Sequence, residues 1–401
     1  MQTYSEDEIA YIIKLKEQAS LSWVEIAYDF NKKFKENKTH ENLRHCYEYY
    51  KNYFEQDDGQ VQMLKQLHRT KKNSSYTAKE NKTILDHWNG RDDILETIKE
   101  VIREISLNKY KVPKIKVDSK KDNMTLEILL GDIHFGKLIK NNDGKVLVNC
   151  EEIRRRIRKL SSQIIKEIER NGKYFNVERL IVNILGDIIE SSHMHGIESL
   201  KSSEFGTSKQ VFEAIQSLFE DFFVPLSATG IKIDVSCVTG NHDRVGDKAT
   251  YVRPGEENLT YIIYKTLQLL CQSSNLTNID FNITMKSYNM TKVYGNIIIT
   301  EHGEELKNLN RDTLANLMNK RQTQVGEIVN FYRVGHWHEH ITYGQGKMQV
   351  NGCLYGQDDY SEKKGFDSEA LQILNYYVQT DKRRTCFFRS FPIYLQEKIN
   401  S

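Results

Sequence analysis

The 401-residue chain lacks the cysteine pattern of a disulfide-stapled protein or of a cysteine-zinc knot. It has six cysteines and no Cys-x-x-Cys pair, and so few in a chain of this length provide no disulfide framework. We therefore expect reduced thiols at Cys46, Cys150, Cys237, Cys271, Cys353 and Cys386. The length predicts two or three domains, with a core large enough to exclude water from a catalytic site.

Long apolar runs and an excess of one charge are also missing. No stretch approaches the roughly 18 apolar residues of a membrane span, and Met1–Glu8 is acidic where a secretory signal is basic and then apolar. We therefore expect a cytoplasmic location and no membrane partner. The 57 Lys+Arg and 55 Asp+Glu leave a net charge of +2, which excludes the bulk positive charge of a histone-like binder. Any nucleic-acid contact must come from local segments.

Apolar side chains recur at helical spacing in the N-terminal part of the chain. They predict three helices, over residues 7–18, 22–34 and 39–54. Ser5 with Glu8, and Ser22 with Glu25, fit the capping-box pattern at the start of the first two helices. We assign residues 1–56 to a small three-helix domain.

Residues 57–111 are interpreted as a basic helical linker. The segment from Lys65 to Lys121 carries 15 Lys/Arg and 8 Asp/Glu, a local charge of +7, and one helix is expected over residues 92–107. Beyond Pro113, short apolar runs alternate with amphipathic helices, as in an α/β domain. We place that domain over residues 112–401, with helices expected at 153–168, 211–222 and 259–270.

Five apolar, strand-like runs of this domain each end in residues able to bind a metal. The runs cover residues 126–130, 180–185, 231–238, 297–300 and 328–334. They lead into Gly131-Asp132-Ile133-His134, Gly186-Asp187-Ile188-Ile189-Glu190, Gly240-Asn241-His242-Asp243, Glu301-His302-Gly303 and Gly335-His336-Trp337-His338. Loops at the carboxyl ends of sheet strands build the sites of α/β folds. We therefore expect one sheet to bring these side chains into one cluster.

Carboxylates, imidazoles and one amide make up this set, without a thiolate. Such ligands suit Mn²⁺, Fe²⁺ or Zn²⁺, and we favour two divalent ions, with Mn²⁺ first. A carboxylate such as Asp187 can bridge two ions at the roughly 3.5–4 Å separation of two-metal hydrolytic sites.

The five ordered motifs, over residues 124–345, resemble those of the calcineurin-like metallophosphoesterase superfamily. The resemblance implies an α/β fold, a β-sandwich flanked by helices. It assigns one metal to Asp132, His134, Asp187 and His338, and the other to Asp187, Asn241, His302 and His336. It makes His242 the non-ligand histidine that protonates the leaving oxygen or stabilises the transition state, and Glu190 the carboxylate that orients His242.

Two details bear on the substrate. Many phosphoprotein phosphatases of this superfamily continue with Arg-Gly where this chain has Ser191-Ser192, which weakens a protein-phosphatase interpretation. The Gly-Asn-His-Asp and Gly-His-Trp-His forms resemble nuclease subunits of double-strand-break repair complexes and phosphoesterases encoded by bacteriophages. Residues 350–353 and 358–361 are also similar to the phage members. A phage origin would place the protein in the cytoplasm of a bacterial host.

The N-terminal domain resembles a Myb/SANT-like or helix-turn-helix module, through Ser22-Trp23-Val24-Glu25-Ile26-Ala27 and through Arg44, Tyr47 and Tyr50 on the third helix. Such modules place that helix in a DNA groove. Residues 1–54 nevertheless carry 8 Lys/Arg and 9 Asp/Glu, whereas DNA readers are generally basic. DNA and a protein partner both remain open for this module.

The function favoured by these observations is hydrolysis of phosphodiester bonds in DNA by a metal-dependent nuclease. A phosphatase or nucleotide hydrolase acting on small phosphate esters is the first alternative. A DNA-binding adaptor with an inactive phosphoesterase domain is the second. Exonuclease or endonuclease polarity and a homodimeric state stay open.

Two further groups of residues receive a simpler interpretation. His193 and His195 are expected to be ordinary loop residues rather than ligands of a third metal or of substrate. The basic run from Arg154 to Lys159 is expected to be the solvated face of an amphipathic helix rather than a phosphate site.

Overall fold

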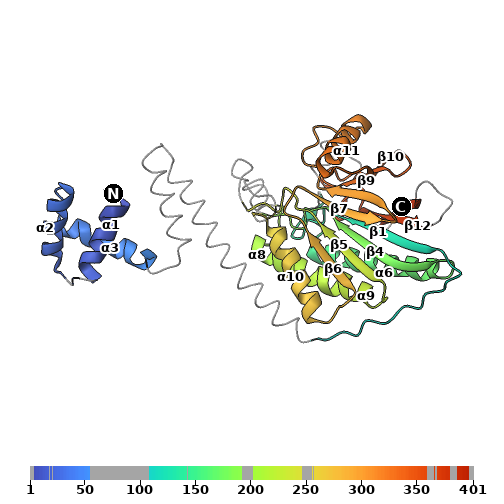
Figure 1. The fold of residues 1–401 in the computed structure, drawn as a ribbon, viewed down its shortest axis with the longest axis horizontal. Helices are drawn as coiled ribbons and strands as arrows, with labels where there is room; N and C mark the ends of the chain where they lie inside the picture. Colours follow the sequence, from blue (N-terminus) through green and yellow to red (C-terminus); the bar gives the residue numbers. More distant parts are fainter. Residues whose placement is uncertain are drawn as a thin grey trace. The chain divides into compact units, whose positions relative to one another are not determined.

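The computed structural model describes residues 4–54 except 18 and 20, 108–191 except 142, 202–245, 257–358, 368–379 and 386–396, together with Gly255 and Gly365. The chain divides into two compact units, Met1–Trp88 and Asn89–Ser401 (Figure 1). The expected linker helix over residues 92–107 and the rest of the linker up to residue 107 lie outside the described residues.

The first unit contains the three expected helices, α1 (Glu6–Glu17), α2 (Trp23–Phe34) and α3 (His40–Phe54). A complete capping box between Ser22 and Glu25 begins α2. The hydroxyl of Ser5 and the carboxylate of Glu8 make the same pair of bonds at the start of α1. The helices share a small core of buried apolar side chains, which consists of Tyr4, Ile9, Ile12, Ile26, Phe30, Leu43 and Cys46. The predicted three-helix domain is therefore present.

Two sheets form the framework of the second unit. A six-stranded sheet has the order β13-β12-β1-β4-β5-β6 and a five-stranded sheet has the order β10-β11-β9-β8-β7. The first contains β1 (Asn123–Leu130), β4 (Asn176–Ile184), β5 (Lys232–Cys237), β6 (Ile279–Ile283), β12 (Leu371–Val378) and β13 (Phe387–Tyr394). The second contains β7 (Tyr288–Val293), β8 (Asn296–Glu301), β9 (Val329–Val334), β10 (Ile341–Tyr343) and β11 (Met348–Val350). A short ribbon of β2 (Ile139–Lys140) and β3 (Val146–Val148) lies after β1.

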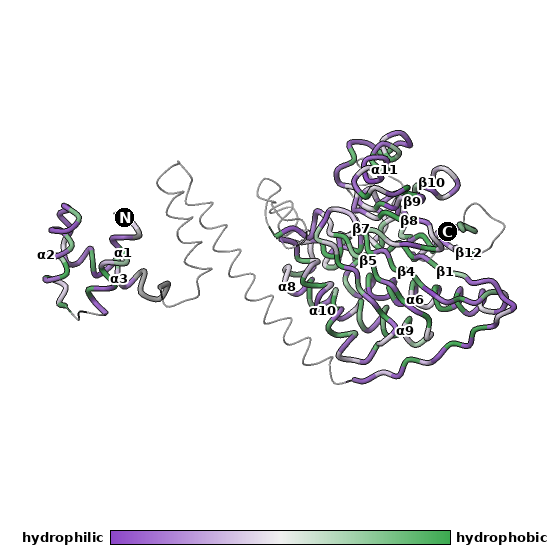
Figure 2. The backbone as a smooth tube through the Cα atoms, in the orientation of Figure 1, coloured by the Kyte–Doolittle hydropathy of each residue, from purple (hydrophilic) through white to green (hydrophobic). Residues whose placement is uncertain are grey.

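Helices cover the outer faces of both sheets (Figure 1). The six-stranded sheet packs against α6 (Cys150–Gly172), α8 (Thr207–Ser217), the π-helical segment η1 (Leu218–Phe223), α9 (Val224–Ser227) and α10 (Leu259–Ser273). On the other side, α11 (Arg311–Val325) packs against the five-stranded sheet. In Figure 2 the strands carry much of the hydrophobic colour and α11 is mostly hydrophilic, in keeping with the two buried residues of α11, Leu314 and Arg321.

The alternation of side chains along the strands explains this layering. On β8, Ile297 and Ile299 join the core beneath α11, whereas Ile298 joins the core between the two sheets. On β1, Leu126 and Ile128 face the helices, and Glu127 between them faces the other sheet. The sandwich therefore has an apolar layer under each set of helices and a partly polar layer between the sheets.

Tyr110, just before the predicted start of the α/β domain at residue 112, packs within the second unit. The amide of Tyr110 donates to the carbonyl of Ser274, and the Tyr110 ring packs edge-on against Phe219. Tyr110 is therefore one of the partly buried side chains that pack against the main core of this unit.

The predicted fold class is confirmed: an α/β sandwich flanked by helices and accompanied by a three-helix unit. All six cysteines are free, as their spacing predicts, and the structure buries all of them. Within the described part of the chain, none of the helices combines the length and the apolar character needed to cross a membrane.

Candidate metal centre

The five motifs meet at one end of the sandwich, and they come from both sheets rather than from one. Asp132, Asp187 and Asn241 follow strands of the six-stranded sheet, whereas His302 and His336 follow strands of the five-stranded sheet. The expectation of a single sheet was therefore wrong. Parallel neighbours within each sheet end at a common edge, and face-to-face packing brings the two edges together.

The loop backbones hold the candidate ligands in an unusual conformation. Five of the seven candidate ligands have a positive φ angle, and this backbone conformation costs free energy for residues other than glycine. They are Asp132, His134, Asp187, His336 and His338, with φ between 49° and 71°. Asp and His tolerate this region better than most residues. The sharp turns aim successive side chains at one point instead of at opposite faces of a strand.

Two glycines allow the loops to approach one another. A Cβ atom at Gly240 would lie 2.1 Å from the carboxylate Oδ1 of Asp187, and one at Gly335 would lie 2.6 Å from Oδ2 of Asp132. Any larger residue at either position would displace a carboxylate. The glycines that precede the motif residues therefore make room for the site itself.

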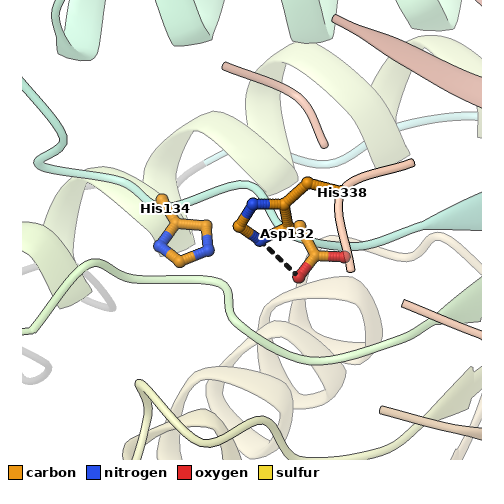
Figure 3. A group of neighbouring side chains, drawn as sticks. All are labelled: Asp132, His134 and His338. Carbon is orange, nitrogen blue, oxygen red and sulfur yellow. Dashed lines mark ion pairs between the residues drawn. The ribbon is translucent and has the colours of Figure 1, made fainter. Parts of the chain in front are cut away.

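Among the described residues three groups of side chains could hold a metal, and Asp132, His134 and His338 form the first (Figure 3). Their ligand atoms lie within 4.8 Å of one another. Nε2 of His338 lies 3.4 Å from Oδ1 of Asp132. Nε2 of His134 is buried and makes no hydrogen bond. A buried nitrogen without a partner is costly, and a cation bound by this group would satisfy it.

Asp187, His302 and His336 form the second group. Nδ1 of His302 donates to the carbonyl of Leu185 at 2.8 Å, which leaves Nε2 to face the group. That Nε2 lies 3.1 Å from Oδ2 of Asp187 and 3.1 Å from Nδ1 of His336. The amide oxygen of Asn241 lies 2.8 Å from the same Nε2. All four side chains that the resemblance assigns to the second metal are thus brought together.

Asp187 lies between the two groups. Its Oδ2 is 3.1 Å from Nε2 of His302 in one group and 3.7 Å from Nε2 of His134 in the other. Its Oδ1 accepts the backbone N–H of His242 at 2.9 Å. A carboxylate in this position fits the bridging role expected from the sequence.

The electrostatics of the cluster favour a positive charge at its centre. Burial raises the pKa of Asp187, but the imidazoles of His302 and His242 outweigh burial and hold this pKa well below its usual range. Burial lowers the pKa of His302, whereas Asp187 and Asp132 more than compensate and raise it to about 10. The carboxylates of Asp187 and Asp132 thus stabilise the positively charged imidazole of His302. A divalent ion held by the same atoms would be stabilised in the same way.

The imidazoles of His336 and His134 have lowered pKa values, which favours the neutral form that binds metals. Burial, and then the charge of His302, lower the pKa of His336 to about 3. Burial and the neighbouring His242 lower the pKa of His134 below its usual value. Imidazoles, ionised carboxylates and an amide oxygen together fit borderline divalent cations.

Glu190 makes a different contact from the one expected. Its Oε2 lies 2.7 Å from Nδ1 of His134 but 3.9 Å from Nδ1 of His242. Nδ1 of His242 instead bonds to the backbone carbonyl of Glu190, at 2.9 Å. The carboxylate thus contacts His134 more closely than His242, and the main chain of the same residue bonds to His242. A separation of three residues could not distinguish the side chain from the main chain.

His242 lies beside the candidate ligands. One of its nitrogens lies within 4.8 Å of ligand atoms of His134 and Asp187, and its side chain is 15% exposed, more than that of either neighbour. This position suits a group that meets substrate beside the metals. It also keeps open a role as a ligand.

Three supporting residues had no assigned role in the sequence. Lys137 bridges Glu190 at 3.2 Å and Asp358 at 2.9 Å. Asp243 accepts the N–H groups of Ile188 and Ile189, and burial, followed by the charge of Asp187, raises its pKa to about 7. Tyr355 bonds to His338. Asp243 belongs to the motif Gly240-Asn241-His242-Asp243 and could have been found there, whereas no sequence motif includes Lys137 or Tyr355.

Two other expectations have different outcomes. His193 and His195 lie outside the described residues.

The basic run on α6 is not simply a solvated face, because its arginines pair with acidic residues of the same helix and of neighbouring helices. These pairs join Arg154 to Glu213 and Asp221, Arg155 and Arg156 to Glu152, and Arg158 to Asp221.

Comparison with known proteins gives only distant likenesses. No family model matches the chain, and no curated protein matches it. Among solved structures, a predicted phosphoesterase from Streptococcus pneumoniae TIGR4 is 13% identical, with a TM-score of 0.27 over 68% of this chain and 98% of the other. A novel archaeal phosphodiesterase is 11% identical, with a TM-score of 0.30 over 67% and 99% of the two chains. A putative 5'-nucleotidase from Staphylococcus aureus is 9% identical, with a TM-score of 0.32 over 68% and 55%.

Proposed function

We propose that this protein is a metal-dependent phosphoesterase that hydrolyses phosphodiester bonds, with DNA as its substrate. One observation carries the first part: six of the seven candidate ligands lie in two groups, the amide of Asn241 contacts His302, and Asp187 of the second group lies 3.7 Å from His134 of the first. Two divalent ions held there would polarise a phosphoryl group and activate a water molecule. The resemblance of the motifs to calcineurin-like metallophosphoesterases agrees with this chemistry.

The protein's own residues supply orientation and a proton. Asn241 directs its amide oxygen toward the second group and leaves its N–H₂ available to a phosphoryl oxygen. Nδ1 of His242, by donating its proton to the carbonyl of Glu190, turns Nε2 away from the main chain. A protonated Nε2 can then donate to the departing oxygen, which is general acid catalysis.

The experiment for this first part is turnover by the purified full-length chain with Mn²⁺, Fe²⁺ or Zn²⁺. We expect hydrolysis of bis-p-nitrophenyl phosphate, a generic phosphodiester, that stops when the metal is chelated. Faster hydrolysis of the corresponding monoester would favour the phosphatase alternative. No turnover with any of the metals would favour the inactive adaptor.

DNA is proposed as the substrate because of charge outside the metal centre. In the described part of the basic segment, residues 108–121, six lysines accompany one acidic residue, Asp118. Five of these lysines are exposed: Lys109, Lys111, Lys114, Lys116 and Lys120. Exposed lysines on an extended segment suit sequence-independent contacts with phosphates. The three-helix unit, with Arg44 exposed on α3, is the second proposed DNA contact.

Labelled single- and double-stranded DNA, cleaved over a range of salt concentrations, tests this second part. A full-length variant with Lys111→Gln, Lys114→Gln and Lys116→Gln should bind DNA more weakly, with a salt slope smaller by about 2–3. Its hydrolysis of the small phosphodiester should be unchanged. An unchanged salt slope would remove this segment from DNA binding, and an inability to cleave any DNA would limit the substrate to small esters.

A further inference from the structure

We propose that Leu354 and Tyr355 clamp the first ligand group alone, so that Tyr355 is a positioning residue for one of the two metal ions. The inference rests on the proposed function, which supplies the metals. The two residues follow β11 and touch all three members of the group. The backbone N–H of Leu354 donates to the carbonyl of Asp132 at 2.9 Å. The Tyr355 ring meets His134 edge-on at 5.1 Å, and its hydroxyl lies 2.9 Å from Nδ1 of His338.

The contact with His338 determines which nitrogen faces the metal. Nδ1 points at the Tyr355 hydroxyl, while Nε2 points inward and lies 3.4 Å from Oδ1 of Asp132. A ligating imidazole donates its other N–H to a neighbouring acceptor, which fixes both its tautomer and its ring orientation. The hydroxyl oxygen of Tyr355 is that acceptor for His338. Glu190 has the same relation to His134.

The clamp is itself anchored to α6. Nη1 of Arg156 donates to the carbonyl of Leu354 at 3.0 Å and to the carbonyl of Tyr355 at 2.7 Å. Nε of Arg156 donates to Glu152 at 2.7 Å, one turn earlier on the helix. Arg156 is 6% exposed and Tyr355 is 3% exposed. This arginine of the basic run therefore connects a helix on the outside of the sandwich to the metal centre.

The second ligand group is oriented by other atoms. His302 is held by the carbonyl of Leu185, and the two groups are linked through the backbone of His336, whose N–H donates to the carboxylate of Asp132 at 3.0 Å, and through Asp187. The contacts of Tyr355 are with His134, His338 and the ammonium group of Lys137, which lies 5.2 Å from the ring centre. Loss of the Tyr355 hydroxyl should consequently weaken one ion and leave the other in place.

The test is stepwise Mn²⁺ binding to the metal-free full-length protein, followed by calorimetry and by metal analysis. The wild-type chain should bind two ions. Tyr355→Phe keeps the ring and removes only the hydroxyl, and it should weaken one ion about 10- to 100-fold while the other keeps its affinity. Tyr376→Phe is the matched control, because Tyr376 is also buried and its hydroxyl bonds to Glu167, away from the metal centre. It should bind both ions as the wild type does.

A second variant distinguishes loss of the clamp from a general loss of stability. Arg156→Lys leaves every candidate ligand and Tyr355 in place but relaxes the clamp, so it should weaken the same single ion. Thermal unfolding of the metal-free Tyr355→Phe protein should match that of the Tyr376→Phe protein. If Tyr355→Phe binds two ions like the wild type, or weakens both equally, the clamp is refuted. If the wild-type chain binds no ion, the proposed function fails instead.

Discussion

Oε2 of Glu190 lies 2.7 Å from Nδ1 of His134, and its other oxygen lies 3.2 Å from the ammonium group of Lys137. Burial raises the pKa of Glu190, but the contact with His134 and the charge of Lys137 outweigh it and lower this pKa to about 2. The carboxylate is therefore ionised over the whole working range of pH. It holds His134 so that Nε2 faces the first ligand group.

Replacing Glu190 should therefore affect metal binding as well as turnover. Glu190→Gln removes the charge that fixes His134 but keeps an oxygen acceptor, so we expect affinity for one ion to fall about 10-fold, toward the lower end of outer-shell effects. Metal titration beside steady-state kinetics measures both quantities. Normal metal affinity with reduced turnover would instead show that this carboxylate acts on His242.

Removing the shared carboxylate should release both ions. Asp187→Ala deletes the group that faces His134 on one side and His302 on the other. Metal analysis after dialysis should give two ions for the wild-type chain and far fewer for the variant, with no measurable turnover. A variant that still holds two ions would contradict the bridging position. Asp143→Ala, in an exposed turn, serves as the control.

The role of His242 can be separated from that of a ligand. His242→Ala should retain both ions and lose roughly 10²- to 10⁴-fold in turnover, the usual contribution of a positioned acid. His340→Ala, which removes an exposed histidine just beyond the same site, should change neither quantity. Loss of an ion from His242→Ala would make this residue a ligand.

The close approach at Gly240 gives a steric test. Gly240→Ala places a methyl group 2.1 Å from Oδ1 of Asp187, so the carboxylate must move and both ions should bind weakly. Gly206→Ala is the matched control, since nothing lies within 4 Å of its added Cβ and its φ of −65° suits alanine. Metal titration of the two variants should differ sharply. Equal metal affinities would mean that the loop at Gly240 moves to accept the methyl group without weakening metal binding.

A buried ion pair between the sheets gives a prediction about stability. Nε of Arg333 on β9 lies 3.2 Å from Glu127 on β1, and both side chains are completely buried. Glu127→Gln leaves the Arg333 charge unpaired and should lower the free energy of unfolding by about 3–5 kcal/mol. Glu327→Gln, which breaks an exposed pair with Lys292, should cost less than about 1 kcal/mol. Urea unfolding of the metal-free variants compares the two directly.

The sequence was sufficient for features that depend on local order. Helical periodicity and capping boxes located α1 and α2 to within a residue or two, and the five apolar runs coincide with β1, β4, β5, β8 and β9. Because each candidate ligand directly follows one of these strands, its place at a strand end was also predictable. Local patterns work here since hydrogen bonding and burial within one strand or helix repeat along the chain.

Contacts between distant segments were decided only by the tertiary structure. Whether Glu190 reaches His134 or His242 depends on positive φ angles in the loops after β1 and β4, and Tyr355 meets His338 only because β11 pairs beside β9. The division of the site between two sheets follows from packing of apolar and polar faces that no single run encodes. Residue types at strand ends determine which chemistry is available. The angle at which two sheets pack determines which of those residues meet.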